Sequence, residues 1–202
     1  MPNPPRVFVP EISSHVFPRG INGGAIVRDD YDRDHLRGLI RKAARNHPVA
    51  VHAFAIMTTH YHLIVTPERA GALSKAMQAI AIAHTLYFNS KYERTGTIWN
   101  ERFGSALLED ESYWYNCLRY VDLNPLRAGA VATPEASRWS SYRVHALGYP
   151  CDWLTPHRLY LQLGSTPAKR QLAYRAMCRV PLTEEELAAQ RYPPAKTVLE
   201  VS

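Results

Sequence analysis

Two apolar, β-branched runs separated by a Thr-Thr pair place the strongest constraint on how this chain folds. The first run ends at Met57, and the second begins just after Thr58-Thr59. Runs of this length and composition that flank a short polar break are typical of adjacent strands. We therefore predict two neighbouring strands over residues 50–57 and 60–66.

The second predicted strand begins with two histidines separated by one residue. Residues two apart in a strand point to the same face, so His60 and His62 are expected side by side, with Tyr61 on the opposite face. Neutral imidazole is the commonest protein ligand for metal ions, so the pair suits a metal site. Spacing alone also fits two half-exposed histidines without a ligand.

Length and charge narrow the class of protein. The chain has 202 residues, and its formal net charge is +6. That length suits one domain, or one domain with an extension. Arginine outnumbers lysine, and a basic, arginine-rich chain favours an acidic partner, with nucleic acid as the first candidate.

The three cysteines and the absence of long apolar runs bear on the cellular compartment. Cys117, Cys151 and Cys178 are far apart, and no pair has the C-x-x-C spacing of a zinc or redox site. No run of apolar residues approaches the length that spans a membrane, and the N-terminus has no apolar signal core. These features predict a reducing, cytoplasmic setting and no membrane partner.

Helical patterns alternate with the strand patterns. Apolar spacing predicts a helix that begins within residues 28–34 and runs to residue 46, and further helices over residues 72–92 and 111–124, with Asp110 as the cap of the last. A fourth, basic helix is expected over residues 168–178. Mixed order of strands and helices favours an α+β fold with helices packed against an antiparallel sheet.

The third predicted helix contains residues of suitable chemistry for a site. Tyr120 and Asn124 are four apart and share a helix face. A phenol can act as a nucleophile, and an amide oxygen is an acceptable metal ligand beside imidazole. Core packing of Tyr120 and helix termination at Asn124 explain the same residues, and Tyr113 and Tyr115 are rival nucleophiles.

Four motifs together resemble the single-tyrosine, His-hydrophobic-His transposases, and within them the REP-associated tyrosine transposases. They span Ala53 to Val65, Trp99-Asn100-Glu101-Arg102-Phe103, Arg119 to Gly129 and Trp139-Ser140-Ser141-Tyr142. Their order and spacing match over roughly residues 14–145. One departure is Thr58-Thr59, where the family usually has Pro-Asn before the first histidine of the pair.

The resemblance implies a ferredoxin-like core with a central antiparallel sheet and packed helices. Residues 1–145 would be the catalytic domain, and residues 146–202 a helical or irregular C-terminal extension, with a disordered tail from Tyr192. His60, His62 and Asn124 would bind a divalent metal, Mg²⁺ or Mn²⁺ by the resemblance, whereas ligand softness also admits Zn²⁺. Tyr120 falls at the position of the nucleophile.

Further residues fall in family motifs or basic segments that suggest contact with DNA. Trp99 and Arg102 belong to the Trp-x-x-Arg-Phe motif, and Arg127 to the Asn-Pro-x-Arg-Ala-Gly motif. Lys169 and Arg170 begin the basic helical segment. Arg127 also suits the negative end of a helix dipole, and the basic segment also suits a solvated helix face.

The implied activity is metal-dependent transesterification of single-stranded and hairpin DNA through a covalent 5′-phosphotyrosine. A palindromic-repeat hairpin would be the partner in the bacterial cytoplasm, with nucleoid association when bound, and a monomer is favoured over a homodimer. Two alternatives stay open: a protein that binds repeat hairpins without cutting them, and a metal-dependent nuclease that uses water. A covalent protein–DNA adduct separates the first interpretation from both.

Overall fold

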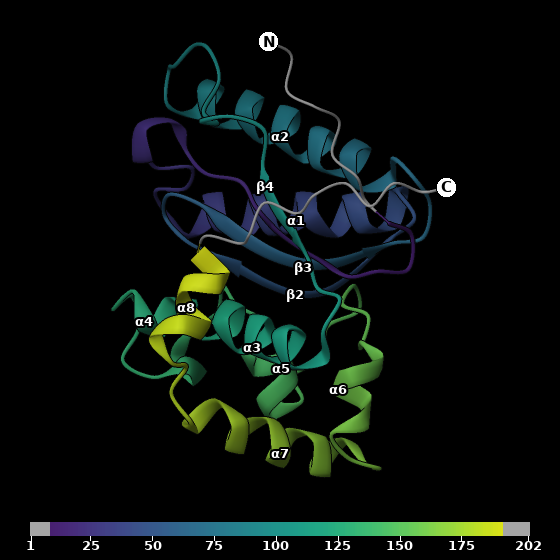
Figure 1. Ribbon diagram of the computed structural model, residues 1–202. Coiled ribbons are helices and arrows are strands. Elements are labelled where there is room, and N and C mark those ends of the chain that lie inside the picture. Colours follow the sequence, from purple (N-terminus) through teal and green to yellow (C-terminus); the bar gives the residue numbers. More distant parts are fainter. Residues whose placement is uncertain (1–8, 192–202) are drawn as a thin grey trace.

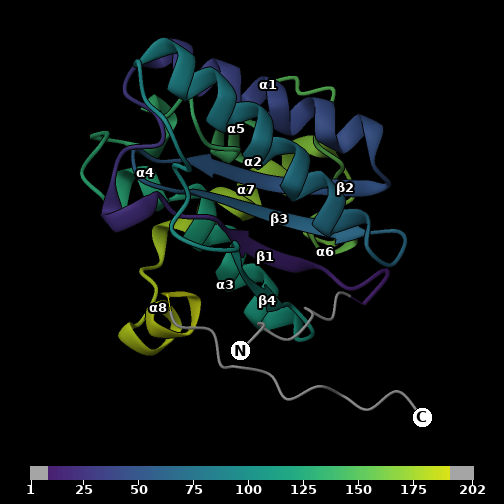
Figure 2. The ribbon, with the colours of Figure 1, turned by 90° about the horizontal axis from the view of Figure 1, so that it is seen from above.

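The computed structural model of the protein describes residues 9–191. Their strands form one antiparallel sheet in the order β2-β3-β1-β4, which Figure 2 shows beneath two long helices. The strands are β1 (Ser14–Phe17), β2 (Val49–Ile56), β3 (Tyr61–Pro67) and β4 (Gly104–Leu107). The tail predicted to be disordered from Tyr192 lies outside the described residues.

Helices follow the strands in the order of a ferredoxin-like core, β1-α1-β2-β3-α2-β4. The helices are α1 (Asp30–Asn46), α2 (Ala72–Lys91), α3 (Glu111–Asp122), α4 (Asn124–Arg127), α5 (Tyr142–Leu147), α6 (Arg158–Gln162), α7 (Pro167–Arg179) and α8 (Glu184–Arg191). The predicted α+β class, with an antiparallel sheet and packed helices, is confirmed. No helix of the described chain combines the length and apolarity needed to cross a bilayer.

The predicted pair of central strands forms a hairpin, β2–β3. Its register runs from Val49 opposite Pro67 to Ile56 opposite Tyr61. The Thr-Thr break forms the turn, where the Met57 N–H donates to the His60 carbonyl at 2.9 Å. Helices cover both faces of the sheet, which explains why these strands are nearly continuous apolar runs rather than alternating ones.

The two faces of the sheet bury separate hydrophobic clusters (Figure 1). Helices α1 and α2 cover one face, against side chains such as Leu63 and Phe54. Helices α3 and α5 cover the other face, against Ala55 and Ile64. Because side chains alternate along a strand, His62 points with Ile64 toward α3, whereas Tyr61 points toward α2.

Capping residues explain where the principal helices begin. Asp29 and Asp32 form a reciprocal capping box at the start of α1. Asp110 accepts a hydrogen bond from the Tyr113 N–H at 2.8 Å and caps α3, as predicted from the sequence. The α3 helix ends at Asp122, earlier than residue 124, and Leu123 joins it to the separate short helix α4, which begins at Asn124.

The segment after residue 145 packs onto the second cluster. Helix α7 lies against α5 on the side away from the sheet, so it forms an outer layer (Figure 1). The Asp122 carboxylate joins these layers, since it accepts hydrogen bonds from Ser141 on the segment before α5, from His145 Nδ1 at 2.8 Å and from the Tyr174 hydroxyl at 2.7 Å. The domain boundary at residue 145 stays a prediction.

Buried histidines should make the fold sensitive to acid. Burial lowers the pKa of His52 and of His84 to about 4 each. Between their ordinary pKa near 6.5 and about 4, the unfolded chain binds protons that the folded chain does not. The free energy of unfolding should therefore decrease as the pH is lowered through this window, by about 1.4 kcal/mol per pH unit for each such histidine. Urea denaturation at pH 7.5 and pH 5.5 measures this effect, and equal stabilities would contradict it.

Candidate functional site

The two predicted histidines lie at the start of β3, next to the predicted tyrosine. The ring centroids of His60 and His62 are 4.9 Å apart, and the rings are perpendicular. The ring of Tyr120 stands edge-on to that of His62, with the centroids 5.4 Å apart. The fold therefore brings together residues that are about sixty positions apart in the chain.

Tyr120 and Asn124 remain about one turn apart although α3 ends between them. Leu123 keeps right-handed helical angles, and its N–H donates to the Arg119 carbonyl at 2.9 Å. Asn124 opens the short helix α4, and it is 8% exposed. Tyr120 is 5% exposed, so both side chains are largely withdrawn from water.

His15 on β1 is a site residue that sequence reasoning missed. Its Nε2 lies 2.8 Å from His62 Nδ1, and the two rings are stacked with centroids 5.0 Å apart. The Tyr120 ring is also near, with its centroid 6.0 Å from that of His15. The ferredoxin-like topology places β1 beside β3, so this topology, once predicted, was the signal that could have identified His15.

All three imidazoles are held in the neutral form. Burial, together with the nearby Arg19 guanidinium, lowers the pKa of His15 to about 3 and that of His60 to about 4. Burial also lowers the pKa of His62 well below its ordinary value. Only a neutral imidazole can offer a lone pair to a metal ion, so the ionisation state suits ligation.

The donor atoms of the histidines fit a metal ion. His62 Nε2 is buried and has no hydrogen-bond partner within residues 9–191. When His62 Nδ1–H donates to His15, that Nε2 carries a lone pair. His60 Nδ1 lies 3.0 Å from the Thr59 hydroxyl, which leaves its Nε2 as the second donor.

Histidine and carboxylate side chains do not complete a metal site by themselves. In the part of the chain that the structure describes, no group of three or more His, Cys, Asp or Glu side chains is arranged to hold a metal ion. A metal on His60 and His62 would therefore depend on the Asn124 amide oxygen or on oxygens of a bound substrate. Such an open site is typical of catalytic rather than structural metals.

Two arginines give the site a positive border. The Arg127 guanidinium lies 4.7 Å from the centroid of the Tyr120 ring, in a cation–π arrangement. Arg19 pairs with His60 in an isolated β-bridge, and its side chain is exposed. Both cations contribute to the lowered pKa of His62. This arrangement suits an anionic substrate group above the histidines.

The rival tyrosines on α3 point elsewhere. The Tyr113 hydroxyl donates to the Ala189 carbonyl of α8 at 3.2 Å, and the Tyr115 hydroxyl donates to the Leu159 carbonyl of α6 at 2.8 Å. Burial raises the pKa of Tyr113 to about 12. Both hydroxyls therefore serve contacts with the C-terminal helices.

The motif residues Trp99 and Arg102 lie on the α2 side of the sheet, away from Tyr120. Trp99 is 8% exposed, and its indole N–H donates to the Ala81 carbonyl of α2 at 3.1 Å. Arg102 is exposed, and both residues line a cavity of about 510 Å³ beside α2. Trp99 thus packs against α2.

The predicted basic residues of α7 are remote from the histidines. Lys169 is exposed, and Arg170 donates to the Gly164 carbonyl at 3.1 Å. Helix α7 lies in the outer layer, beyond α5 (Figure 1). A contact of these residues with DNA would therefore involve a part of the DNA distant from the histidine–tyrosine cluster.

We predict that His15 orients His62 for metal binding. His15→Ala removes the group that fixes the His62 tautomer, so Mn²⁺ affinity should fall by about 10- to 100-fold. Calorimetric titration of Mn²⁺ measures this loss. His15→Gln, which keeps a hydrogen-bonding group at that position, should recover part of the affinity. Equal affinity of wild type and both variants would contradict the role.

Comparisons with known proteins show similarity to transposases. Residues 9–124 match the protein family described as "Transposase IS200 like". The chain is 28% identical over 133 residues to a Haemophilus influenzae protein described as a REP-associated tyrosine transposase, across 59% of this chain and 75% of that protein. Its fold is similar to that of a REP-associated tyrosine transposase solved bound to a REP hairpin, with a TM-score of 0.61, 20% identity, and coverage of 77% of this chain and 92% of that one.

Proposed function

The chain belongs to the IS200-like transposase family, and from that premise we propose that it cuts and rejoins single-stranded DNA beside a hairpin through a covalent phosphotyrosine. Tyr120 is the proposed nucleophile. His60, His62 and Asn124 are the proposed ligands of a divalent metal, and the cation of choice is Mg²⁺ or Mn²⁺.

One observation carries the proposal. The Tyr120 ring stands 5.4 Å from the ring of His62, whose Nε2 is buried without a partner among the described residues. A buried imidazole nitrogen without a partner is costly unless a ligand satisfies it. A nucleophilic side chain, two neutral imidazoles that can bind a metal ion, and a flanking guanidinium are a set of groups that suits phosphoryl transfer.

The reaction is an exchange of phosphodiester bonds. The Tyr120 hydroxyl oxygen attacks the scissile phosphorus, and the bond from phosphorus to the 3′ oxygen breaks. The products are a 5′-phosphotyrosine and a free 3′-hydroxyl, whose proton balances the one lost by the phenol. Arg127, above the Tyr120 ring, would stabilise the negative charge that develops at the phenolic oxygen. The reverse attack rejoins the strands without an external energy source.

A divalent cation held by His60, His62 and Asn124 would act as a Lewis acid on the scissile phosphate. The contribution of the protein is to keep both imidazoles neutral by burial and to hold their rings in place. His15 fixes His62, and the Thr59 hydroxyl fixes His60. Thr59 stands where the family usually has Asn, so this chain supplies its own partner for the first histidine.

A hairpin formed by a palindromic repeat is the proposed partner. The relative solved with a REP hairpin supports this choice, as does the net charge of +6. We further propose that the chain acts as a monomer, in the bacterial cytoplasm, and that residues 146–202 extend a catalytic domain of residues 1–145.

Incubation of the protein with 3′-end-labelled hairpin DNA tests the proposal, because the fragment that carries the 3′ end is the one that stays joined to Tyr120. The hairpin should carry single-stranded flanks, and the reactions should contain Mn²⁺, Mg²⁺ or EDTA. We expect a labelled band that migrates with the protein on a denaturing gel, in the metal-containing reactions only. Cleavage without such a band would indicate hydrolysis by water, and binding without cleavage would indicate a protein that only recognises the hairpin.

A further inference from the structure

The Trp-Ser-Ser-Tyr motif, residues 139–142, runs along the outer edge of β2. The Ile56 N–H donates to the Trp139 carbonyl at 2.8 Å, and the Ser141 N–H donates to the Phe54 carbonyl at 2.9 Å. Since β2 is the edge strand of the sheet, these bonds occupy backbone groups that no other strand pairs with. The motif therefore continues the sheet, although Ser141 is 87 positions from Phe54 in the chain.

The side chain of Ser141 extends from this edge to α3. Its hydroxyl accepts a hydrogen bond from the Phe54 N–H at 2.9 Å and donates to the Asp122 carboxylate. Ser141 and Asp122 are both fully buried. A hydrogen bond to a charged group is stronger than one between neutral groups, and the exclusion of water strengthens it further. One hydroxyl thus ties the backbone of β2 to the end of α3.

The local sequence favours a different use of this hydroxyl. Ser141 is the N-cap of α5, and a serine at such a position usually accepts a hydrogen bond from a backbone N–H of the helix that follows. The Ser141 side chain makes no capping bond of this kind. Its hydroxyl is engaged by β2 and α3 instead, so the contact between distant elements takes precedence over the local one.

The two ends of this link belong to the two halves of the proposed site. The β2 end is next to Ala55, which pairs directly with His62 across the hairpin. The α3 end is Asp122, two residues after Tyr120 and two before Asn124. The link therefore joins the hairpin that carries the histidines to the helix end that carries the nucleophile.

Hydrophobic packing sets the spacing between these halves less sharply. The sheet presents the small side chains of Ala53 and Ala55 to the cluster that it forms with α3. Burial of apolar surface is non-directional, and methyl groups form few ridges into which a helix could lock. A directional hydrogen bond from Ser141 to Asp122 is therefore suited to fix where the end of α3 lies relative to the hairpin.

We propose that Ser141 is a positioning residue for strand cleavage, because through Asp122 it holds the Tyr120 hydroxyl where attack on a phosphate beside His60 and His62 is possible. This inference rests on the proposed function for the identity of the reaction. Misplacement of a reacting group by about 1 Å costs about a hundredfold in rate. Loss of the Ser141 hydroxyl should therefore slow the chemical step without weakening the binding of DNA.

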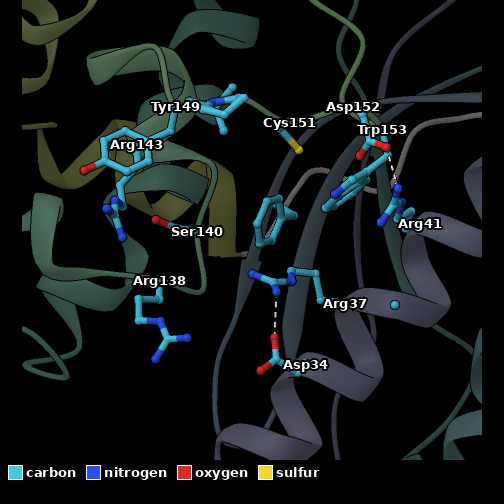
Figure 3. Close-up of a pocket in the computed structure, with 14 residues that line it drawn as sticks. Asp34, Arg37, Arg41, Arg138, Ser140, Arg143, Tyr149, Cys151, Asp152 and Trp153 are labelled. Carbon is cyan, nitrogen blue, oxygen red and sulfur yellow. Dashed lines mark hydrogen bonds and ion pairs between the residues drawn. The ribbon is translucent and has the colours of Figure 1, made fainter.

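Two matched variants separate positioning from a general loss of stability. Tyr174→Phe removes another donor to the Asp122 carboxylate, a hydroxyl at 2.7 Å on the outer helix α7. Ser140→Ala removes the neighbouring hydroxyl of the motif, which has no hydrogen-bond partner among the described residues. Ser140 instead lines a cavity of about 540 Å³ together with Arg138 and Arg143 (Figure 3). Neither substitution alters the link between β2 and α3.

Single-turnover rates of adduct formation, with saturating hairpin DNA and saturating Mn²⁺, test the proposal. Ser141→Ala should slow adduct formation by about 10- to 100-fold. Tyr174→Phe and Ser140→Ala should each stay within about threefold of wild type. Hairpin affinity, measured in EDTA on proteins that also carry Tyr120→Phe, should agree within about twofold for all of them, because the proposed loss is in chemistry rather than in binding.

NMR of the protein without DNA follows the position of Tyr120 itself. The Tyr120 ring stands edge-on to His62 with the centroids 5.4 Å apart, so its ring current shifts the imidazole resonances of His62. Ser141→Ala should move these resonances, whereas Tyr174→Phe should leave them at wild-type values. Ser141→Cys, which keeps a similar volume but only a weak donor, serves if Ser141→Ala does not fold, and its effects should have the same direction.

Several outcomes would overturn the inference. These are a wild-type rate for Ser141→Ala, equal slowing by Ser141→Ala and Tyr174→Phe, and slowing without a shift of the His62 resonances. If wild type forms no adduct, the proposed reaction is wrong, and the His62 resonances alone decide whether Ser141 positions Tyr120. If the adduct forms and Ser141→Ala behaves like Tyr174→Phe, only the positioning role is wrong.

Discussion

Tyr120→Phe should abolish the covalent adduct and reduce strand cleavage by at least about a thousand-fold, because the substitution removes the only attacking oxygen in the proposed reaction. Phenylalanine keeps the ring, and with it the contacts to His62 and Arg127. The free energy of unfolding should therefore change by less than about 1 kcal/mol. Hairpin affinity should also persist, since the hydroxyl is proposed to act in chemistry rather than in binding.

The neighbouring tyrosines supply matched controls for this prediction. Tyr113→Phe and Tyr115→Phe each remove a hydroxyl from the same helix, but those hydroxyls contact backbone carbonyls of α8 and α6. Both variants should still form the adduct, and each should lose about 1 kcal/mol of stability with its hydrogen bond. If Tyr120→Phe formed the adduct and Tyr113→Phe or Tyr115→Phe did not, the nucleophile would be misassigned.

Asp122→Asn should cause the largest loss of stability among single substitutions near the site. The carboxylate of Asp122 is fully buried and accepts from Ser141, His145 and Tyr174. An amide has one acceptor oxygen and adds a donor, so at least one of these buried donors would lose its partner. We expect the free energy of unfolding to fall by about 2–4 kcal/mol.

Urea denaturation measures this loss, and Asp30→Asn is the control. Asp30 is an exposed carboxylate that pairs with Arg33 at 3.5 Å, so its replacement should change stability by no more than about 0.5 kcal/mol. The m-value of Asp122→Asn should stay that of wild type if only the native network is weakened. A stability within about 0.5 kcal/mol of wild type would mean that the network contributes nothing.

Local pattern predicted the core of the fold correctly. The apolar runs at 50–57 and 60–66 became β2 and β3 with shifts of one residue, because burial on both faces leaves an unambiguous apolar signal. The cap at Asp110 was also predictable, since it depends on residues three apart.

Features that depend on distant contacts could not be predicted in this way. His15 sits in a strand of four residues, and His62 lies 47 positions away along the chain, so no local pattern linked the two histidines. The short helices α5 and α6 carry too few residues for a periodic signal. The docking of α5 and α7 beside the end of α3 places Ser141, His145 and Tyr174 around Asp122, a network that the sequence did not indicate.

The candidate residues of the site were predicted from motifs and spacing, whereas their relative positions depend on the fold. His60, His62 and Tyr120 lie together, and Asn124 follows one turn after Tyr120. The basic residues Lys169 and Arg170 belong to α7, and this helix lies in an outer layer instead. Net charge indicated an anionic partner, but only the three-dimensional arrangement shows which arginines surround a cavity.

Mass spectrometry of the covalent adduct tests the central claim most directly. The protein is incubated with flanked hairpin DNA and Mn²⁺, the bound DNA is trimmed with nuclease, and the protein is digested into peptides. The account predicts one modified peptide, with a 5′-phosphorylated nucleotide on the hydroxyl of Tyr120. A nucleotide attached to any other residue, or cleaved DNA with only unmodified peptides, would contradict it.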